Sequence, residues 1–383
     1  GTAEVDAAFL AEIEGWRETL ARNIALRNPG LTVRDLNFAV QATIDRIIFL
    51  RITEDRGIEP YGRLRDTVQQ GAGVYPRLAE LFRGADSRYN SGLFYFKPEQ
   101  DREDGADEFT LSLTIDDKVL TAITKSLYYP DSPYEFSALP ANILGQVYEQ
   151  FLGKVIRLTA GGRAKVEEKP EVKKAGGVYY TPTYIVDYIV EHTVGKLLEG
   201  KTPRQIWGSR RVAPLRILDP ACGSGTFLLE AYQLLLDWYL EQYSGVDAET
   251  NARQERIYRD ANGAWQLTTG ERKRILTTHI FGVDIDPQAV GVTKLSLLLK
   301  VLEGEALQGP GTQLSFVQER VLPDLGANIR CGNSLIGSDY YRQATLGLTD
   351  DETIYRINAF DWEKGFPRAM AAGGFDAVIG NPP

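Results

Sequence analysis

The sequence predicts an α/β protein in which a parallel sheet is preceded by a mainly α-helical domain. Three observations support this prediction. In the second half of the chain, short apolar runs alternate with longer amphipathic runs; in the first half, apolar residues recur every three or four positions; and a polar, glycine-rich segment separates the two patterns. Strands that alternate with helices form parallel sheets covered on both faces. Such sheets bind ligands at the carboxyl ends of their strands.

The composition is that of a soluble globular protein with two or three domains. Of the 383 residues, 43% are apolar and 25% are charged, which is ordinary for this class. No apolar run reaches the ~18 residues of a membrane-spanning helix, and the start "GTAEVDAAFL" has no secretory signal pattern. Cys222 and Cys331 lack CxxC spacing, and His192 and His279 are the only histidines. We therefore expect a cytoplasmic protein without a disulfide scaffold, a metal site or a membrane partner. The net charge of −9 excludes a protein that is basic all over, but not a local groove for nucleic acid.

Residues 1–158 have the pattern of a mainly helical connector domain. Helical spacing of three and four joins the apolar residues Phe9, Leu10, Ile13, Trp16, Leu20 and Ile24. A second amphipathic run begins at Asp35, and its other face carries Arg46, Arg51, Glu54, Asp55 and Arg56. For this charged face we favour a solvated surface over a surface that contacts DNA.

Three further segments of the front domain are assigned from their patterns. Leu93–Phe96 and Phe109–Ile115 look like short strands, and Ala141–Leu158 looks like another helix. The stretch "TAGGRAKVEEKPEVKKAGG", residues 159–177, is rich in glycine and alternating charge and is bracketed by glycine pairs. It is interpreted as a flexible linker and domain boundary. Its cations could contact a phosphate backbone, although a solvated loop explains them equally well.

Residues 178–383 contain the alternating strands and helices. The predicted strands are Leu215–Asp219, His279–Asp284 and the apolar part of Phe375–Gly380. The predicted helices are Gly225–Tyr243 after the first strand and a run that starts with Pro287 after the second.

A glycine-containing loop, "DPACGSGTF", follows the first of these strands. Gly223 and Gly225 allow a tight turn and let backbone N–H groups come close to a ligand, while Asp219 can orient the loop or accept a hydrogen bond from a cation. An NAD-dependent dehydrogenase would also have such a loop. However, Leu228 stands where the third glycine of GxGxxG would be, so a dehydrogenase is the weakest alternative.

Asp284 ends the second strand in "GVDID", where a carboxylate is well placed to bind the two hydroxyls of a ribose. It follows Asp219 by 284 − 219 = 65 positions, whereas a dinucleotide fold has about 20. We attribute the excess to an inserted polar stretch, roughly Ser244–Gly270, which is either functional or partly disordered. The alternative role for Asp284 is a turn or N-cap carboxylate ahead of Pro287; we favour the ribose role.

The chain ends in "FDAVIGNPP", a strand that delivers an amide to its tip. The side-chain oxygen of Asn381 and the carbonyl of Pro382 would form two acceptors, and Pro382 and Pro383 hold this segment stiffly without offering an N–H donor. Two such acceptors suit a planar amino group such as adenine N6. Accepting both of its hydrogens would direct the nitrogen lone pair toward an incoming methyl carbon. The alternative is a strand-ending turn without function.

Five ordered blocks carry a family resemblance: "GGVYYTPTYIVDYIV", "ILDPACGSGTFLLEA", "FGVDIDPQAVGVTKLSLLL", "CGNSLIG" and "FDAVIGNPP". In this order they resemble the gamma-class N6-adenine DNA methyltransferases, and most of all the fused restriction–modification enzymes of type IIG. The resemblance covers Gly176–Pro383, and the helical front more loosely. It implies the Rossmann-like parallel sheet of S-adenosylmethionine-dependent methyltransferases.

The resemblance also implies a role for individual residues. The residues implied to hold S-adenosylmethionine are Tyr180, Thr181, Pro182, Asp219, Ala221, Gly223, Gly225, Asp284, Ile285 and Asn333. The first three would approach its methionine end and the next four would form the loop beneath it. Asp284 would hold the ribose and Ile285 would pack on the adenine ring. Asn333 stands where many relatives have aspartate toward that ring.

The implied substrate is duplex DNA with the target adenine flipped out of the stack, where Asn381, Pro382 and Pro383 would be the catalytic block. In this class the remaining strands of the sheet and a target recognition domain follow the NPP block, and a nuclease domain precedes the helical front. We therefore expect a fragment, truncated at the NPP block, that binds the cofactor but methylates poorly. Two alternatives stay open: a non-catalytic assembly or specificity module with a vestigial cofactor fold, and an N-methyltransferase acting on RNA or on a protein amide.

Overall fold

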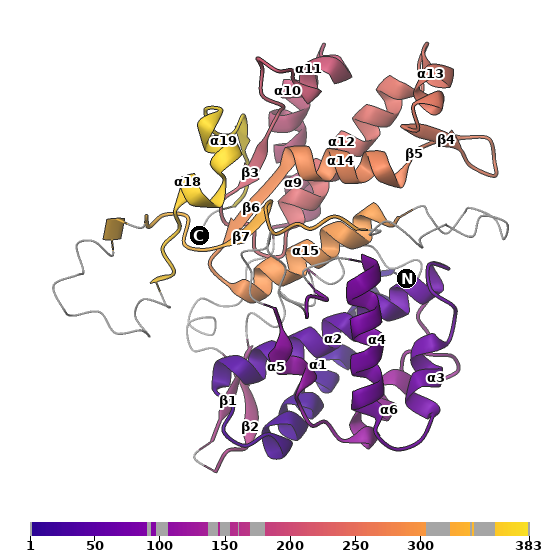
Figure 1. The fold of residues 1–383 in the computed structure, drawn as a ribbon, viewed down its shortest axis with the longest axis vertical. Coiled ribbons are helices and arrows are strands. Elements are labelled where there is room, and N and C mark those ends of the chain that lie inside the picture. Colours follow the sequence, from indigo (N-terminus) through magenta and orange to yellow (C-terminus); the bar gives the residue numbers. More distant parts are fainter. Residues whose placement is uncertain are drawn as a thin grey trace. The chain divides into compact units, whose positions relative to one another are not determined.

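The structure is a computed structural model. It describes residues 2–89, 93–96, 106–136, 145, 154–159, 161–168, 181–303, 322–337, 339–340 and 357–381. The chain divides into two compact units (Figure 1). One comprises residues 1–180 with 314–322, and the other comprises residues 181–313 with 323–383.

The first unit is mainly helical. Its elements are α1 (Thr2–Arg27), α2 (Val33–Asp55), α3 (Arg63–Gln69), α4 (Val74–Tyr89), α5 (Glu108–Leu111), α6 (Asp117–Lys125), β1 (Lys154–Leu158) and β2 (Ala164–Glu168). The two predicted N-terminal helices are confirmed. The second begins at a capping box, because the Thr32 hydroxyl accepts from Asp35 N and the Asp35 carboxylate accepts from Thr32 N.

The charged face of α2 is buried, so the prediction of a solvated face is wrong, and the DNA-facing alternative fails with it. Arg46 and Arg51 are only 2% and 3% exposed. Arg46 donates to Asp107 Oδ2 at 2.6 Å, and its guanidinium lies 4.7 Å from the Phe96 ring centroid. Arg51 pairs with Asp55 and donates to a backbone carbonyl. Planar guanidinium groups can be buried in this way because carboxylates, carbonyls and aromatic faces satisfy them together.

The two short strands predicted in this unit are absent. Leu93–Phe96 is irregular, and the carbonyl of Leu93 accepts from Arg46 Nε at 2.9 Å rather than from a neighbouring strand. Phe109 lies in the short helix α5, which starts where the Asp107 carboxylate caps Thr110 N at 2.9 Å. Local capping and one long-range arginine contact therefore override the β propensity of these segments.

An antiparallel hairpin, β1–β2, occupies segments that were predicted otherwise. Lys154–Leu158 was assigned to a helix, and Ala164–Glu168 to the flexible linker. The two strands pair from Lys154↔Glu168 to Leu158↔Ala164, and Glu167 has ion pairs with Lys165 and Arg157. The charged side chains of Lys165 and Glu167 thus recur at every second position, as expected for one face of a strand. Residues 160 and 169–177 of the predicted linker and most of residues 141–153 lie outside the described residues.

The second unit begins with helices and contains the predicted parallel sheet. Its elements before the second strand of that sheet are α9 (Thr183–Val190), the π-helical turn η1 (Glu191–Gly195), α10 (Lys196–Leu198), α11 (Pro203–Trp207), β3 (Ile217–Asp219), α12 (Thr226–Tyr243), α13 (Ala248–Arg253), β4 (Ile257–Arg259), β5 (Trp265–Leu267) and α14 (Thr269–His279). The later elements are β6 (Ile280–Asp284), α15 (Pro287–Val301), β7 (Ile329–Cys331), α18 (Trp362–Gly365), α19 (Pro367–Ala371) and β8 (Ala377–Val378).

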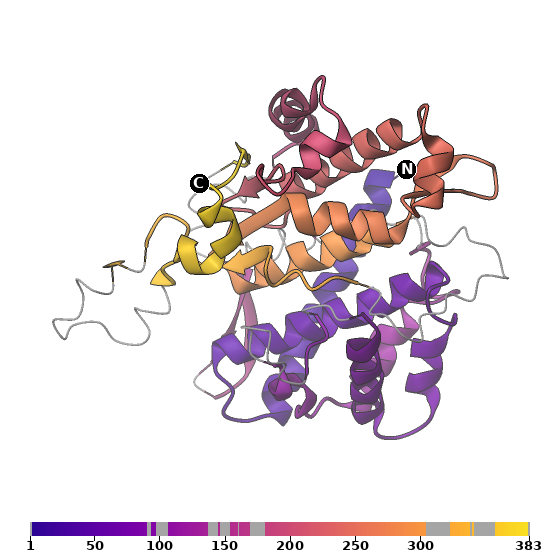
Figure 2. The same cartoon turned by 45° about the horizontal axis from the view of Figure 1, so that its top comes forward.

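Four parallel strands form the sheet in the order β7-β6-β3-β8. The strands β7, β6 and β3 are labelled in Figure 1, and Figure 2 shows the same cartoon turned by 45°. The chain runs outward from β3 to β6 and β7, and then returns to the other side of β3 as β8. The strand order therefore reverses between β3 and β8. In open parallel sheets, the carboxyl ends at such a reversal form the ligand crevice.

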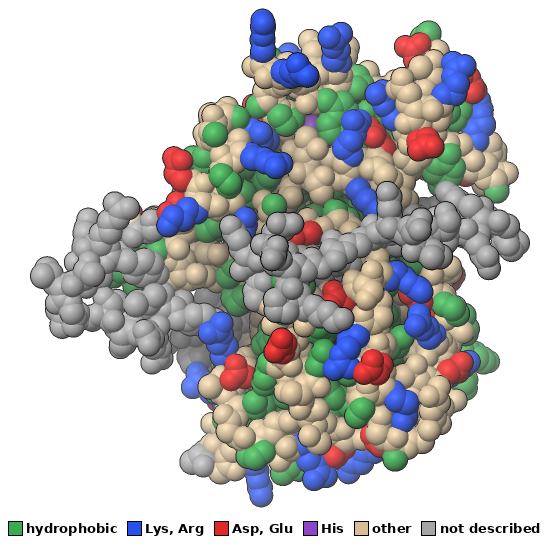
Figure 3. All heavy atoms as spheres, in the orientation of Figure 1, with side chains coloured by type: hydrophobic (Ala, Val, Ile, Leu, Met, Phe, Trp, Pro, Cys, Tyr) green, Lys and Arg blue, Asp and Glu red, His purple; other side chains and the backbone are tan. Residues whose placement is uncertain are grey.

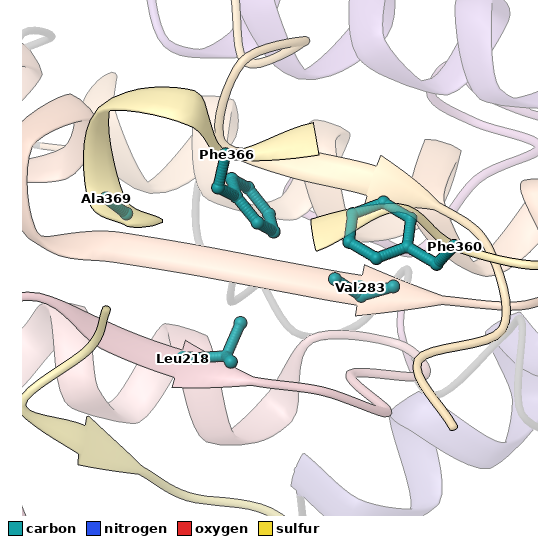
Figure 4. Packing of buried hydrophobic residues seen from close by; sticks show 5 residues of the cluster. All are labelled: Leu218, Val283, Phe360, Phe366 and Ala369. Atoms are coloured by element: carbon teal, nitrogen blue, oxygen red, sulfur yellow. The ribbon is translucent and has the colours of Figure 1, made fainter. Parts of the chain in front are cut away.

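The two faces of this sheet are covered by different helices. Leu218 of β3 and Val283 of β6 pack with Phe360, Phe366 and Ala369, which lie in and around α18 and α19 (Figure 4). The adjacent residue Gly282 faces the other side, since a Cβ built on it would lie 2.7 Å from Leu228 Cδ1 of α12. The close approach of α12 thus depends on a glycine in the middle of β6.

The amino end of the sheet is tied together by a buried histidine. His279 Nδ1 donates to the carbonyl of Leu215 at 2.7 Å, and its Nε2 accepts from the Tyr239 hydroxyl at 3.0 Å. Burial lowers the pKa of His279 to about 4, so the imidazole is neutral and its tautomer is fixed by these two partners. The segments that lead into β3 and β6 are thereby held against α12.

The inserted polar stretch, Ser244–Gly270, is folded in the structure. It forms α13 and the antiparallel hairpin β4–β5, and the Arg259 guanidinium lies 4.0 Å from the Trp265 ring centroid. Of the two alternatives for this stretch, partial disorder is therefore wrong, and a functional role stays a prediction. Within the described ranges, no helix has both the length and the hydropathy needed to cross a bilayer.

Candidate active site at the carboxyl ends of the strands

Several residues that the sequence singled out lie at the carboxyl edge of the sheet. Asp219 ends β3, Asp284 ends β6, Asn333 follows β7, and Asn381 follows β8. The parallel register, with Leu218 opposite both Phe281 and Val378, brings these strand ends to one edge. Tyr180, Pro382 and Pro383 lie outside the described residues.

The loop between β3 and α12 uses its two glycines differently. Gly225 has φ +84°, and a Cβ there would lie 2.8 Å from the Thr293 side chain of α15. Gly223 has φ +52°, but a Cβ there would meet nothing within 4 Å. Thr293 Oγ1 donates to the Gly223 carbonyl at 2.9 Å and holds the loop against α15. Gly225 is therefore required by packing, whereas Gly223 borders open space that a ligand can enter.

Asp284 joins the two loops that follow β3 and β6. Its Oδ2 accepts from Gly223 N at 2.8 Å, and its Oδ1 accepts from Asp286 N at 2.9 Å. The N-cap of α15 is Asp286, whose carboxylate accepts from Gln288 N. Asp284 thus holds a turn and is not the cap itself. Burial raises the pKa of its carboxyl, and each oxygen keeps one lone pair for a further donor.

Asp219 is the most buried carboxyl group of the site, at 1% exposed. Its Oδ1 accepts from Ala221 N at 3.0 Å, so it does orient the loop. Its pKa is raised to about 7, because burial, with a smaller effect of the nearby Asp284 charge, outweighs the hydrogen bond from Ala221 N that lowers it. Gly380 has φ +147°, and a Cβ there would lie 2.7 Å from Asp219 Oδ1. A glycine before Asn381 is therefore needed for β8 to pass this carboxyl group.

Asn381 is placed by β8 and meets the segment that precedes α9. Ile379 N donates to the Leu218 carbonyl at 2.9 Å, which extends the β3–β8 pairing beyond β8 itself. Asn381 Nδ2 then donates to Thr181 Oγ1 at 3.2 Å. Thr181 and Pro182 thus lie beside the target-binding amide that the sequence predicted.

Ile285 and Asn333 lie at the β6–β7 side of the edge. Ile285 is 47% exposed, so an apolar side chain faces solvent here. Asn333 Oδ1 accepts from Leu335 N at 3.1 Å and is engaged in its own turn. Asn358, with φ +44°, accepts from Asn333 N at 2.6 Å through its carbonyl, and its Nδ2 lies 3.4 Å from Cys331 Sγ. Sequence reasoning missed Asn358 and Thr293, because nothing local in the sequence connects either residue with the strand ends.

Two cavities lie away from this edge. One, of about 640 Å³, is at the amino ends of the strands and includes Arg216, Phe281 and Arg330 in its lining. The other, of about 910 Å³, lies in the first unit near Pro29 and Leu158. The described residues contain no group of three or more His, Cys, Asp or Glu side chains that could hold a metal ion.

Comparisons with known proteins agree with the motifs at this edge. The family model for N-6 DNA Methylase matches residues 140–313, and the model for Eco57I restriction-modification methylase matches residues 278–383. The type II restriction enzyme and methyltransferase RM.Eco57I of Escherichia coli is 33% identical over 380 residues, 99% of this chain and 34% of that protein. The putative type II restriction enzyme and methyltransferase RM.MjaORFECS2P of Methanocaldococcus jannaschii is 27% identical over 77% of this chain and 27% of its own length.

The chain thus spans about a third or less of these relatives. Among solved structures, the type IIL restriction-modification enzyme MmeI in complex with DNA aligns with 98% of this chain and 43% of its own, at 15% identity and a TM-score of 0.46. That likeness is too weak to support a conclusion. The sequence matches are stronger and agree with one another. The chain therefore belongs to the N6-adenine DNA methyltransferases of restriction–modification systems.

Proposed function

We propose that the protein transfers a methyl group from S-adenosylmethionine to N6 of adenine in duplex DNA. The observation that carries this proposal is the arrangement of the carboxyl edge of the sheet. One edge holds a glycine loop open at Gly223, the carboxylate of Asp284, and the amide of Asn381. These are the groups that a nucleoside-containing methyl donor and an exocyclic amine require, and they come from three neighbouring strands.

The residues present fit S-adenosylmethionine. Asp284 has one lone pair left on each oxygen for the two ribose hydroxyls. The exposed side chain of Ile285 offers an apolar surface to the adenine ring. Asp219, with a pKa of about 7, would be held in its ionised form by the cationic end of the cofactor. We therefore assign the finer fold to the Rossmann-like methyltransferases that use this cofactor.

In the proposed reaction, the residues of the chain bind and orient rather than react. The side-chain oxygen of Asn381 and the carbonyl of Pro382 would accept the two hydrogens of the target amine. Bound S-adenosylmethionine would supply the methyl group and leave as S-adenosylhomocysteine once its S–CH₃ bond is broken, and the amine would release one proton to solvent as the new N–C bond forms. The target must leave the base stack, since these acceptors cannot reach it inside a duplex; flipping costs a few kcal/mol. Catalysis then rests on positioning.

The whole protein's partners are part of the proposal. We propose that residues 1–158 form a connector and residues 178–383 the cofactor-binding part of the methyltransferase domain, within a longer protein that also recognises the DNA sequence. The name of RM.Eco57I, a type II restriction enzyme and methyltransferase, joins the two activities. We extend that pairing to this protein and propose an accompanying nuclease.

Calorimetry with S-adenosylmethionine tests the proposal on the full-length protein, comparing wild type with Asp284→Ala. The variant loses charge-assisted hydrogen bonds to the ribose and should bind about tenfold or more weakly. Asp260→Ala is a matched control, because Asp260 also holds a turn through two backbone N–H groups, of Asn262 and Ala264, but lies outside the site. Its affinity should equal that of wild type.

Detection of N6-methyladenine in DNA after incubation tests the reaction itself. If wild-type protein bound no S-adenosylmethionine, the proposal would be wrong and a non-catalytic assembly module would be favoured. If it bound the cofactor but methylated only RNA or a protein amide, the DNA substrate would be wrong while the cofactor site stood.

A further inference from the structure

The amide of Asn381 has one side-chain partner among the described residues, the hydroxyl of Thr181. The bond runs from Asn381 Nδ2 to Thr181 Oγ1 at 3.2 Å and joins residues 200 positions apart in the chain. We propose that Thr181 is a positioning residue whose hydroxyl couples the amino-acid end of the bound cofactor to the orientation of the Asn381 amide. This inference rests on the proposed function.

The orientation of the amide decides whether it can bind an amine. A side-chain amide has an acceptor oxygen on one side and an NH₂ donor on the other. The target amine offers N–H donors, so it pairs with Oδ1 and is repelled by the NH₂ group. In the structure, Nδ2 faces Thr181, and Oδ1 has no partner among the described residues. This is the productive orientation.

Thr181 alone does not fix that orientation. A hydroxyl has one donor and two acceptor positions, so it could equally donate to Oδ1 of a flipped amide. The flipped amide would then present its NH₂ group to the target. What removes this ambiguity is a strong acceptor that takes the hydroxyl hydrogen. Only lone pairs of Oγ1 would then face Asn381, and the amide must turn its NH₂ group toward Thr181.

The strand order indicates where such an acceptor comes from. The nucleoside end of the ligand belongs at β6, where Asp284 and Ile285 lie, and the Gly223 loop follows β3. The opposite end of the ligand therefore extends toward β8, where Thr181 meets Asn381. In S-adenosylmethionine this end carries an ammonium and a carboxylate. The buried carboxyl of Asp219 suits the ammonium and leaves the carboxylate for the Thr181 hydroxyl.

The coupling has a measurable consequence. A ligand with the carboxylate should strengthen capture of the flipped base, and the base should strengthen ligand binding by the same factor. We expect about 2- to 12-fold, which is the range of one neutral hydrogen bond. A ligand without the carboxylate should bind the nucleoside pocket and give little or no coupling.

The experiment uses the full-length protein and duplex DNA that keeps the target adenine and carries 2-aminopurine at the neighbouring position, after sequencing of methylated DNA has located the site. The fluorescence of 2-aminopurine rises when the stacked target adenine flips out, and DNA affinity is measured with S-adenosylhomocysteine, with its decarboxylated analogue, and with neither. Wild type should show coupling with the first ligand only. Thr181→Val, which keeps the shape but lacks the hydroxyl, should lose the coupling, and Thr181→Ser should retain it.

The outcomes separate this inference from the proposed function. If wild type neither bound S-adenosylhomocysteine nor flipped the target adenine, the proposed function would fail first. If it bound both, but the decarboxylated analogue coupled as strongly, the role of Thr181 would be refuted while the function stood. The analogue comparison needs no variant, so a poorly folded Thr181→Val protein would not prevent the test.

Discussion

The two carboxyl groups of the site affect the stability of the fold in different ways. Asp284 accepts two backbone N–H groups and holds the Gly223 loop in place. Asp219 accepts one and is almost fully buried. A buried carboxylate with a single donor is poorly compensated for lost water. Ionisation of Asp219 therefore destabilises the fold unless a cation is bound beside it.

This cost makes the stability of the unliganded protein depend on pH. The pKa of Asp219 is raised from 3.8 in the unfolded chain to about 7 in the folded protein. The stability that this carboxyl group contributes is therefore fully present below pH 3.8 and is lost as pH rises through about 7. Asp219→Asn removes the titration. We expect the free energy of unfolding of the variant, relative to wild type, to be about 2 kcal/mol higher at pH 8 than at pH 5.

Urea denaturation at the two pH values measures this difference. Asp45 in the first unit also has a pKa raised by burial to about 7, but it is present in both proteins and cancels. An equal difference between variant and wild type at pH 5 and pH 8 would contradict the assignment to Asp219.

At the scale of elements, the loop between β3 and α12 contains one glycine that stability requires and another that ligand binding requires. Alanine at either glycine is strained by a positive φ, at about 1 kcal/mol or more. Gly225→Ala also drives a Cβ into Thr293 of α15, which should add about 1–3 kcal/mol of destabilisation. Gly223→Ala meets no neighbour, so its Cβ would instead occupy the space that the cofactor needs.

We therefore expect Gly225→Ala to lower the melting temperature more than Gly223→Ala, and Gly223→Ala to weaken cofactor binding more at a temperature where both are folded. Gly291→Ala in α15 is the control, since a Cβ there meets nothing within 4 Å and φ is not positive. It should leave cofactor affinity unchanged and should not lower the melting temperature, since alanine is favoured over glycine inside a helix by about 1 kcal/mol. If both variants lost stability and affinity to the same extent, the two glycines would not have these separate roles.

Periodic elements could be predicted from the sequence, and elements fixed by distant partners could not. The helices α12 and α15 and the strand β6 carry long apolar patterns that identify them locally. The apolar residues of β1 also fit the end of a helix, and the alternating charges of β2 are equally typical of a solvated linker. Likewise, burial of Arg46 depends on Asp107, which is 61 positions away.

The same distinction holds for the site. Asp219, Asp284 and Asn381 could be found because each follows a recognisable strand, and parallel strands end at one edge. Asn358 and Thr293 reach the edge from a connection and from the face of a helix. Only tertiary structure brings them there, so no local pattern could have identified them.

At the scale of the whole molecule, charge does not identify one binding surface. The net charge is −9, and on the face in Figure 3 blue and red side chains are interspersed over much of the surface. Arg46 and Arg51, which lie on the face considered for DNA contact, are buried in α2. The effects of a bound ligand locate the site more directly than surface charge does.

Hydrogen exchange with and without S-adenosylhomocysteine should map that site. A ligand at 100 times its dissociation constant adds about 2.7 kcal/mol to any opening that destroys its pocket. Peptides covering 219–226 and 284–286 form the proposed pocket, and the first unit contributes none of its described residues. We expect slower exchange in these peptides and unchanged exchange in α2 and α4. Equal protection of α2 and α4 would mean that the ligand binds elsewhere, and the carboxyl edge of the sheet would lose its assignment.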